Sequence, residues 1–248
     1  MLILPLYDDN PRVTAPVVTY GLIAACAVVF LWQLSLGPGA QEAIAFAYGM
    51  VPATLLGSAR LPHELQLVPP WATLITSMFL HGGWLHLLGN MLYLWLFGRG
   101  VESAMGAPRY LVFYLVSGVA AALAQAAADP GAEVPLIGAS GAIAGTLGAY
   151  LVLHPRSNIV VFVWIFIFVR LIAVPAVIVL GLWFLMQLLS ALATASGEPG
   201  IAFWAHVGGF VLGMLLVPLF RRRGVGMLQP RRSTAFSTRR PQRRGPWG

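Results

Sequence analysis

Long runs without a charged side chain are the feature that most limits what this 248-residue chain can fold into. A transmembrane helix needs about 20 consecutive apolar residues, so charge-free gaps of that length are candidate spans. Six gaps are long enough, and they cover 13–41, 65–98, 110–128, 134–155, 171–197 and 199–220. Another gap, 157–169, is too short to cross a bilayer alone. Only 9% of the residues are charged, against roughly a quarter in soluble domains, which excludes a soluble globular protein.

The positions of the few charges indicate the topology, because cytoplasmic loops carry an excess of basic residues. Six spans place almost all arginines on one side of the membrane and leave only Arg60 on the other. The first side then holds Arg12, Arg99, Arg109, Arg156 and the C-terminal tail. We therefore expect both termini to be cytoplasmic. The short segment 157–169 would lie at the cytoplasmic interface or extend the fifth helix.

The predicted fold is all-α, a polytopic bundle of six transmembrane helices. The first helix should lie near Val17 to Leu36, and the second should begin near Trp84, because the glycine pair before it makes a poor helix interior. Residues 37–82 are apolar and rich in Pro and Gly, which predicts a partly embedded first outer loop. The predicted parts of the chain are a cytoplasmic N-terminal segment 1–14, a six-helix domain 15–220 and a disordered, Arg-rich cytoplasmic tail 221–248.

The positive charge of the chain belongs mainly to its tail. All 15 basic residues are arginines, and nine of them lie between Arg221 and Arg244. Because this cluster directly follows an apolar run, membrane lipids are the expected partner and no nucleic acid is predicted. The single cysteine, Cys26, lies in an apolar stretch and offers neither a disulfide nor metal-ligand spacing.

A few polar side chains interrupt the spans, and they are the candidates for function because such residues are costly in lipid. They are His86, Asn90, Gln125, Ser140, Thr146, Gln187 and His206. Thr146 and Gln187 are better explained by a hydrogen bond to the carbonyl oxygen one turn back or by a contact between helices. The second, fourth and sixth helices all run inward in the six-span topology. Four candidates remain on these helices: His86, Asn90, Ser140 and His206. We therefore expect them to lie in the outer part of the membrane.

The surroundings of Ser140 suit a nucleophile. Small neighbours in the sequence GASG, 138–141, leave its hydroxyl uncovered. The helix N-terminus also offers unpaired N–H groups to a developing oxyanion. His86 and Asn90 are four residues apart, so they share a helix face, and both side chains donate hydrogen bonds.

Glycines predict how the fourth and sixth helices pack. Small residues recur in the fourth helix at Gly141 and Gly145, and the sixth helix has a similar pair after His206. Such residues permit contact between helix backbones. This contact would bring His206 to Ser140.

Zinc is the metal alternative, with His81, His86 and His206 as ligands. No Asp or Glu lies inside the spans to complete a ligand set, and the sequence has no HExxH motif. We therefore predict no metal and no other cofactor.

Three motifs, in this order along the chain, resemble the rhomboid family of intramembrane serine proteases, in its bacterial type with the basic six-helix core. They are HGGWLHLLGN at 81–90, GASG at 138–141 and AHVGG at 205–209. The resemblance also includes GRGVE at 98–102 and RLIAVPA at 170–176. It extends over about 15–220 and leaves out the tail.

The resemblance implies a role for each site residue. Ser140 would be the nucleophile and His206 the general base of a catalytic dyad. His86 and Asn90, with the N–H of Ser140, would stabilise the oxyanion. Two further residues would support the site, Gly138 at the turn before the nucleophile and His81 in the motif of the second helix.

The chain departs from the family pattern at two positions. In the first outer loop, Trp71 is followed by Ala72, where the family often has an arginine that anchors the loop. One turn after Ser140, Ala144 occupies a position where an aromatic ring often packs under the base. We expect these departures to affect the rate and the rigidity of the site more than the reaction.

The implied function is hydrolysis of peptide bonds in or near the transmembrane segments of single-span membrane proteins, in a bacterial plasma membrane. A peptide bond inside a helix is shielded by helical hydrogen bonding, so the substrate must unwind locally. The fifth helix and the outer loops are the expected gate.

Two other classes of protein remain open. A non-proteolytic rhomboid-like protein that binds membrane clients would be expected to lack the serine or the histidine. A transporter of small solutes would have charged residues in its spans or paired repeats, and neither is visible. The sequence does not indicate the cleavage motif or the oligomeric state.

Overall fold

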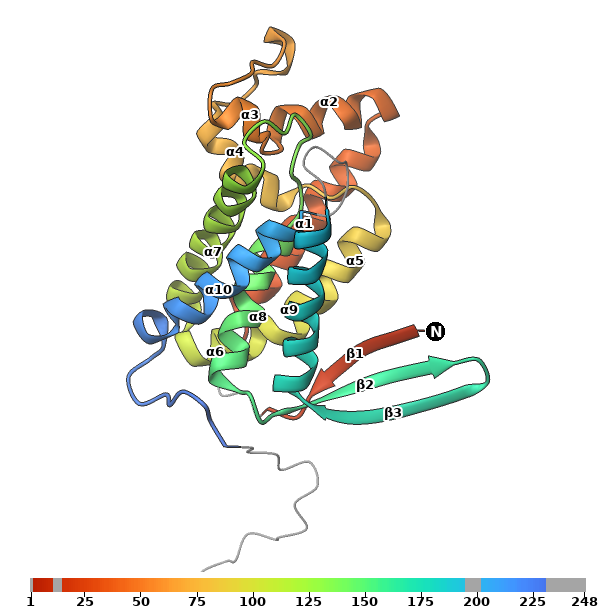
Figure 1. The fold of residues 1–248 in the computed structure, drawn as a ribbon, viewed down its shortest axis with the longest axis vertical. Helices are drawn as coiled ribbons and strands as arrows, with labels where there is room; N and C mark the ends of the chain where they lie inside the picture. The colour runs from red at the N-terminus through yellow and green to blue at the C-terminus, as the bar shows by residue number, and fades with distance from the viewer. Residues whose placement is uncertain (1, 11–14, 195–201, 231–248) are drawn as a thin grey trace, which may run out of the picture.

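A computed structural model describes residues 2–10, 15–194 and 202–230 of the chain. The fold is mostly helical, as predicted (Figure 1). Within the described residues, four helices are long and apolar enough to cross a membrane. They are α1 (Val17–Ser35), α7 (Ala107–Ala128), α9 (Ala176–Ala193) and α10 (Phe203–Phe220).

The second and fourth predicted spans differ from these four. The second begins with α5 (Trp84–Tyr93), continues through a π-helical turn (Leu94–Gly98) and ends with α6 (Arg99–Met105). Its predicted start near Trp84 is confirmed. The fourth, α8 (Ser140–Leu153), has only 14 residues. The count of six spans therefore stays a prediction.

The predicted first outer loop contains short helices. They are α2 (Pro38–Tyr48), α3 (Pro52–Leu55) and α4 (Thr73–Thr76), with 3-10 turns at His63–Leu65, Pro70–Ala72 and Ser77–Phe79. Proline begins α2 and α3, where its fixed φ and missing N–H cost nothing. Figure 1 shows these segments gathered at one end of the bundle, called the outer end here after the predicted topology.

A three-stranded antiparallel sheet lies at the opposite, inner end, where α9 begins (Figure 1). Its strands are β1 (Leu2–Asp8), β2 (Asn158–Ile165) and β3 (Phe168–Pro175), in the order β1-β2-β3. The all-α prediction missed this sheet, and the alternative in which 157–169 extends the fifth helix is wrong. The β-branched and aromatic residues of 158–165 favour a strand once β1 and β3 complete its hydrogen bonds.

Glycines bring α8 and α10 into contact, as the sequence predicts. A β-carbon added at Gly213 would overlap the carbonyl oxygen of Gly145, and one added at Gly209 would overlap that of Gly141. α7 completes this core with other small residues, since Ser117 lies against Gly145. The three helices are thus held at a separation that larger side chains would not allow.

Polar contacts join the elements at the inner end. The buried carboxylate of Glu102 in α6 accepts the N–H groups of Val18 (2.9 Å) and Thr19 (2.8 Å) at the start of α1. This is the favourable position for a negative charge on a helix. The described part of the predicted tail is also held at the inner end, because the N–H of Leu228 donates to the carbonyl oxygen of Val152 (2.8 Å). Disorder is predicted for the whole tail, 221–248, of which 231–248 lies outside the described residues.

Replacing Gly213 by alanine should lower the free energy of unfolding by about 1–3 kcal/mol, because the added carbon overlaps the backbone of α8. Gly181→Ala in α9 is the matched control, since nothing lies within 4 Å of a β-carbon there. That variant should be as stable as the parent or slightly more so. Reversible unfolding in detergent micelles, followed by circular dichroism, measures both. Equal losses in the two variants would contradict the packing of α8 on α10.

Candidate active site

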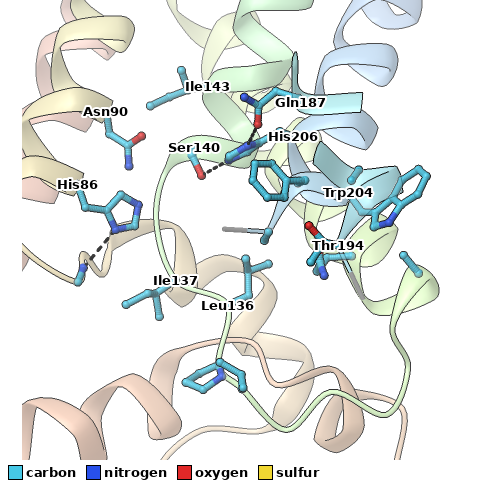
Figure 2. A pocket seen from close by; sticks show the side chains of 18 of the residues that line it. His86, Asn90, Leu136, Ile137, Ser140, Ile143, Gln187, Thr194, Trp204 and His206 are labelled. Carbon is cyan, nitrogen blue, oxygen red and sulfur yellow. Dashed lines mark hydrogen bonds between the residues drawn. The ribbon is translucent and has the colours of Figure 1, made fainter. Parts of the chain in front are cut away.

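One cavity of about 760 Å³ contains all four residues expected to perform chemistry. α5 contributes His86 and Asn90, α8 contributes Ser140, and α10 contributes His206. Figure 2 shows their side chains directed into a common space. Residues of the outer connections, such as Val134, also line the cavity, so it lies toward the outer end.

The chain turns sharply just before the candidate nucleophile. Gly138 has φ +119°, in the region that favours glycine, and its N–H donates to the carbonyl oxygen of Ser77 (2.8 Å). Ser140 is the first residue of α8, where backbone N–H groups lack helical partners. The turn therefore leaves the Ser140 hydroxyl at the cavity wall.

Ser140 and His206 are hydrogen bonded, with 2.8 Å between Oγ and Nε2. The other ring nitrogen, Nδ1, lies 2.7 Å from Oε1 of Gln187 in α9 (Figure 2). Since an amide oxygen only accepts, we assign the hydrogen to Nδ1. Nε2 then has a free lone pair for the serine proton, which is the arrangement a general base requires.

Two hydrogen-bond donors lie across the cavity from this pair. His86 Nδ1 accepts the N–H of Gly82 (3.3 Å), which leaves the ring hydrogen on Nε2. Asn90 Nδ2 is buried and has no hydrogen-bond partner in the described part of the chain. A β-carbon added at Gly138 would lie 2.6 Å from His86 Nε2 and 3.6 Å from Asn90 Nδ2. Both donors therefore approach the turn before Ser140, and glycine provides the space.

His81 lies outside the cavity. Its N–H donates to Oε1 of Gln33 in α1 (3.0 Å), and its Nδ1 is 3.2 Å from the carbonyl oxygen of Phe79. Its ring centroid is 5.1 Å from that of His86. His81 thus connects α1 to the segment before α5 and lies against His86. Its supporting role stays a prediction.

The zinc alternative finds no ligand set in the described residues. Nowhere among them do three or more His, Cys, Asp or Glu side chains come together in a way that could hold a metal ion.

Two contacts of His206 were not predicted from the sequence, and both come from α9. Gln187 does join two helices, as one interpretation of the sequence has it, and its partner in α10 is the imidazole of His206. The Trp183 ring lies 5.9 Å from the His206 ring at an interplanar angle of 40°. Ala144, where the family often has a ring, is fully buried without one. The spacing of Trp183 and Gln187, four residues apart on one helix face, was the available signal.

Comparison with known proteins shows which family the chain belongs to. Residues 69–223 match the family model of the Rhomboid domain. The chain is 33% identical over 136 residues to the rhomboid protease GluP of Bacillus subtilis, which is 55% of this chain and 24% of that protein. It is 32% identical over 150 residues to mitochondrial rhomboid protein 1 of Saccharomyces cerevisiae, 58% of this chain and 40% of that protein.

A third relative is rhomboid-type serine protease 2 of Emericella nidulans, 27% identical over 151 residues, with 59% of this chain and 26% of that protein covered. The chain thus spans well under half the length of these relatives. The match to the family model covers more than half of the chain, and the matched residues include Ser140 and His206. Together with the apolar helices, it establishes that the chain is an integral membrane protein of the rhomboid family.

Proposed function

We propose that this protein is an intramembrane serine endopeptidase that hydrolyses peptide bonds in or near the transmembrane segments of membrane proteins. The observation that carries the proposal is the 2.8 Å hydrogen bond between Ser140 Oγ and His206 Nε2, in a cavity that His86 and Asn90 also line. GluP and the Emericella relative are both named as proteases, which supports the same class of activity.

The first half of the reaction forms an acyl-enzyme. Ser140 Oγ attacks the carbonyl carbon of the scissile bond while His206 Nε2 takes the hydroxyl proton. The negative charge on the tetrahedral intermediate is stabilised by His86 Nε2–H, Asn90 Nδ2–H and the N–H of Ser140. His206 then gives its proton to the leaving amine, and the carbon–nitrogen bond breaks.

The second half releases the product. A water molecule takes the place of the leaving amine, and His206 removes its proton as it attacks the ester. The new tetrahedral intermediate uses the same donors, and Ser140 leaves with the proton that His206 returns. No carboxylate is needed in this scheme, because an amide oxygen faces His206 Nδ1.

The substrates proposed are single-span membrane proteins. The cavity lies toward the outer end, so a cut is expected near the outer end of the substrate helix, where local unwinding exposes the peptide carbonyl. We also propose that the protein resides in a bacterial plasma membrane with both termini cytoplasmic, on the basis of its arginine distribution.

α9 is the proposed gate for these substrates. Only 17% of its span is buried, against 28% to 39% in the other three long helices. It also forms part of the cavity wall through Trp183 and Gln187. Displacing α9 therefore opens the cavity sideways at the smallest loss of packing.

A fluorophosphonate probe should label the protein in detergent or liposomes. Ser140→Ala and His206→Ala should each abolish this labelling, and each should also abolish cleavage of a reconstituted single-span substrate. The probe reacts only with a serine hydroxyl activated by a base. Cleavage that persists in both variants would show that the dyad is not the catalyst. Client binding without labelling or cleavage would instead support the non-proteolytic alternative.

Asn90→Ala should lower kcat by about 10²–10³-fold with little change in KM, because it removes one donor to the oxyanion. Gln229→Ala is the control, since it removes an amide at the inner end, away from the cavity. Single-turnover cleavage measures both variants. An equal effect of the two, or an effect of Asn90→Ala on KM alone, would exclude an oxyanion role for Asn90.

Joining α9 to α5 should abolish cleavage of a transmembrane substrate. In a Cys26→Ala background, Leu85→Cys and Thr194→Cys give one exposed thiol on each wall of the cavity, to be joined by thiol-reactive cross-linkers of graded length. The same variant before cross-linking is the reference. Unchanged turnover after complete cross-linking would remove the gate from the mechanism.

A further inference from the structure

α9, the least buried of the four long helices, also contacts the proposed base through two side chains. Gln187 lies 2.7 Å from His206 Nδ1, and the Trp183 ring lies beside the His206 ring at a tilt of 40°. The same helix is the proposed gate. The position of α9 would therefore control both the entry of substrate and the orientation of the His206 ring.

We propose that Gln187 is a positioning residue for His206, and that the Ser140–His206 pair is competent only while α9 is packed against α10. This inference rests on the proposed protease function and deepens it. The partner of the Gln187 amide oxygen is the imidazole of His206, so Gln187 acts through the base.

The hydrogen bond selects one form of the ring. Neutral imidazole exists as two tautomers, and only the one with hydrogen on Nδ1 leaves Nε2 free to accept the serine proton. The Gln187 carbonyl oxygen at 2.7 Å favours that tautomer and also fixes the rotation of the ring about its χ2 bond. Without this acceptor, part of the population would present an N–H, not a lone pair, to Ser140.

Aromatic packing reinforces the same orientation. Trp183 lies against both His206 and Phe210, with 5.9 Å between ring centroids in each case. Phe184 stacks on Phe210 at 4.7 Å and 24°. His206 and Phe210 are one turn apart on α10, so two neighbouring rings of α9 hold one face of α10. Since Ala144 of α8 provides no ring, this support depends on α9.

The backbone of His206 is held independently of α9. The N–H of Ala205 donates to Oε1 of Gln125 in α7 (3.3 Å), and glycines hold α10 against α8. Moving α9 would therefore leave the Cα of His206 in place and release only its ring. Opening the gate thus disengages the base, and hydrolysis begins after α9 has closed again around the unwound substrate.

Gln187→Leu tests the positioning role, because leucine retains the bulk of the side chain and removes the acceptor. We expect kcat to fall by about tenfold to a hundredfold with KM unchanged. Gln187→Glu keeps an oxygen acceptor and should recover most of kcat. The matched control is Met186→Leu on the same helix, where the side chain is 58% exposed and lies outside the cavity.

A spectroscopic measurement separates positioning from a general loss of structure. With ¹⁵N-labelled histidine, the His206 signals should report one tautomer in the parent and in Gln187→Glu, and a mixture in Gln187→Leu. A kcat within twofold of the parent for Gln187→Leu, or a single unchanged tautomer in that variant, would overturn the proposal.

The cross-linked Leu85→Cys, Thr194→Cys enzyme tests the dependence on α9. It should lose cleavage of the transmembrane substrate but keep the fluorophosphonate labelling rate of the same enzyme before cross-linking, because its base stays oriented. Adding Gln187→Leu should slow labelling in both states. Slower labelling of the cross-linked enzyme would contradict the inference. Labelling of Ser140→Ala at the parent rate would instead overturn the proposed function itself, so the two failures are distinguishable.

Discussion

The backbone contact between α8 and α10 determines where the rest of the site lies. Gly209 packs on the carbonyl oxygen of Gly141, and no side chain separates the two helices at that point. Contact at this distance fixes how far one helix can slide along the other. Ser140 directly precedes Gly141, and His206 is nearly one turn before Gly209, so the same register that packs the helices places the hydroxyl beside the imidazole.

The two ends of the molecule differ in the elements that they hold. At the inner end, Glu102 caps α1 and the guanidinium of Arg222 donates to the carbonyl oxygen of Ser103. The sheet lies at the same end. The outer half contains the cavity, whose wall includes the C-terminal part of α9, the least buried of the four long helices. Conformational freedom is therefore expected where the chemistry takes place, while the opposite end keeps the bundle assembled.

Much of this arrangement follows from local sequence pattern. Charge-free gaps predicted the long helices, and glycine spacing predicted the contact of α8 with α10. β1 was missed because its partner, 158–165, lies far along the chain. β2 and β3 were missed because 158–169 is almost uniformly apolar and lacks the alternation that marks a half-buried strand. The contact of Gln187 with His206 was missed because it depends on how α9 is rotated about its axis, which an almost uniformly apolar helix does not reveal. The catalytic roles of Ser140, His206, His86 and Asn90 stay predictions.

The ring beside His206 bears on how members of one family are compared. An aromatic side chain often found on the fourth helix is absent at Ala144, and an indole reaches the imidazole from the fifth helix instead. A sequence alignment would therefore score this chain as lacking the aromatic ring beside the base, although Trp183 places one there. What corresponds between relatives is the position of the ring in the folded protein. Different helices can supply that ring, so a single alignment column does not show it.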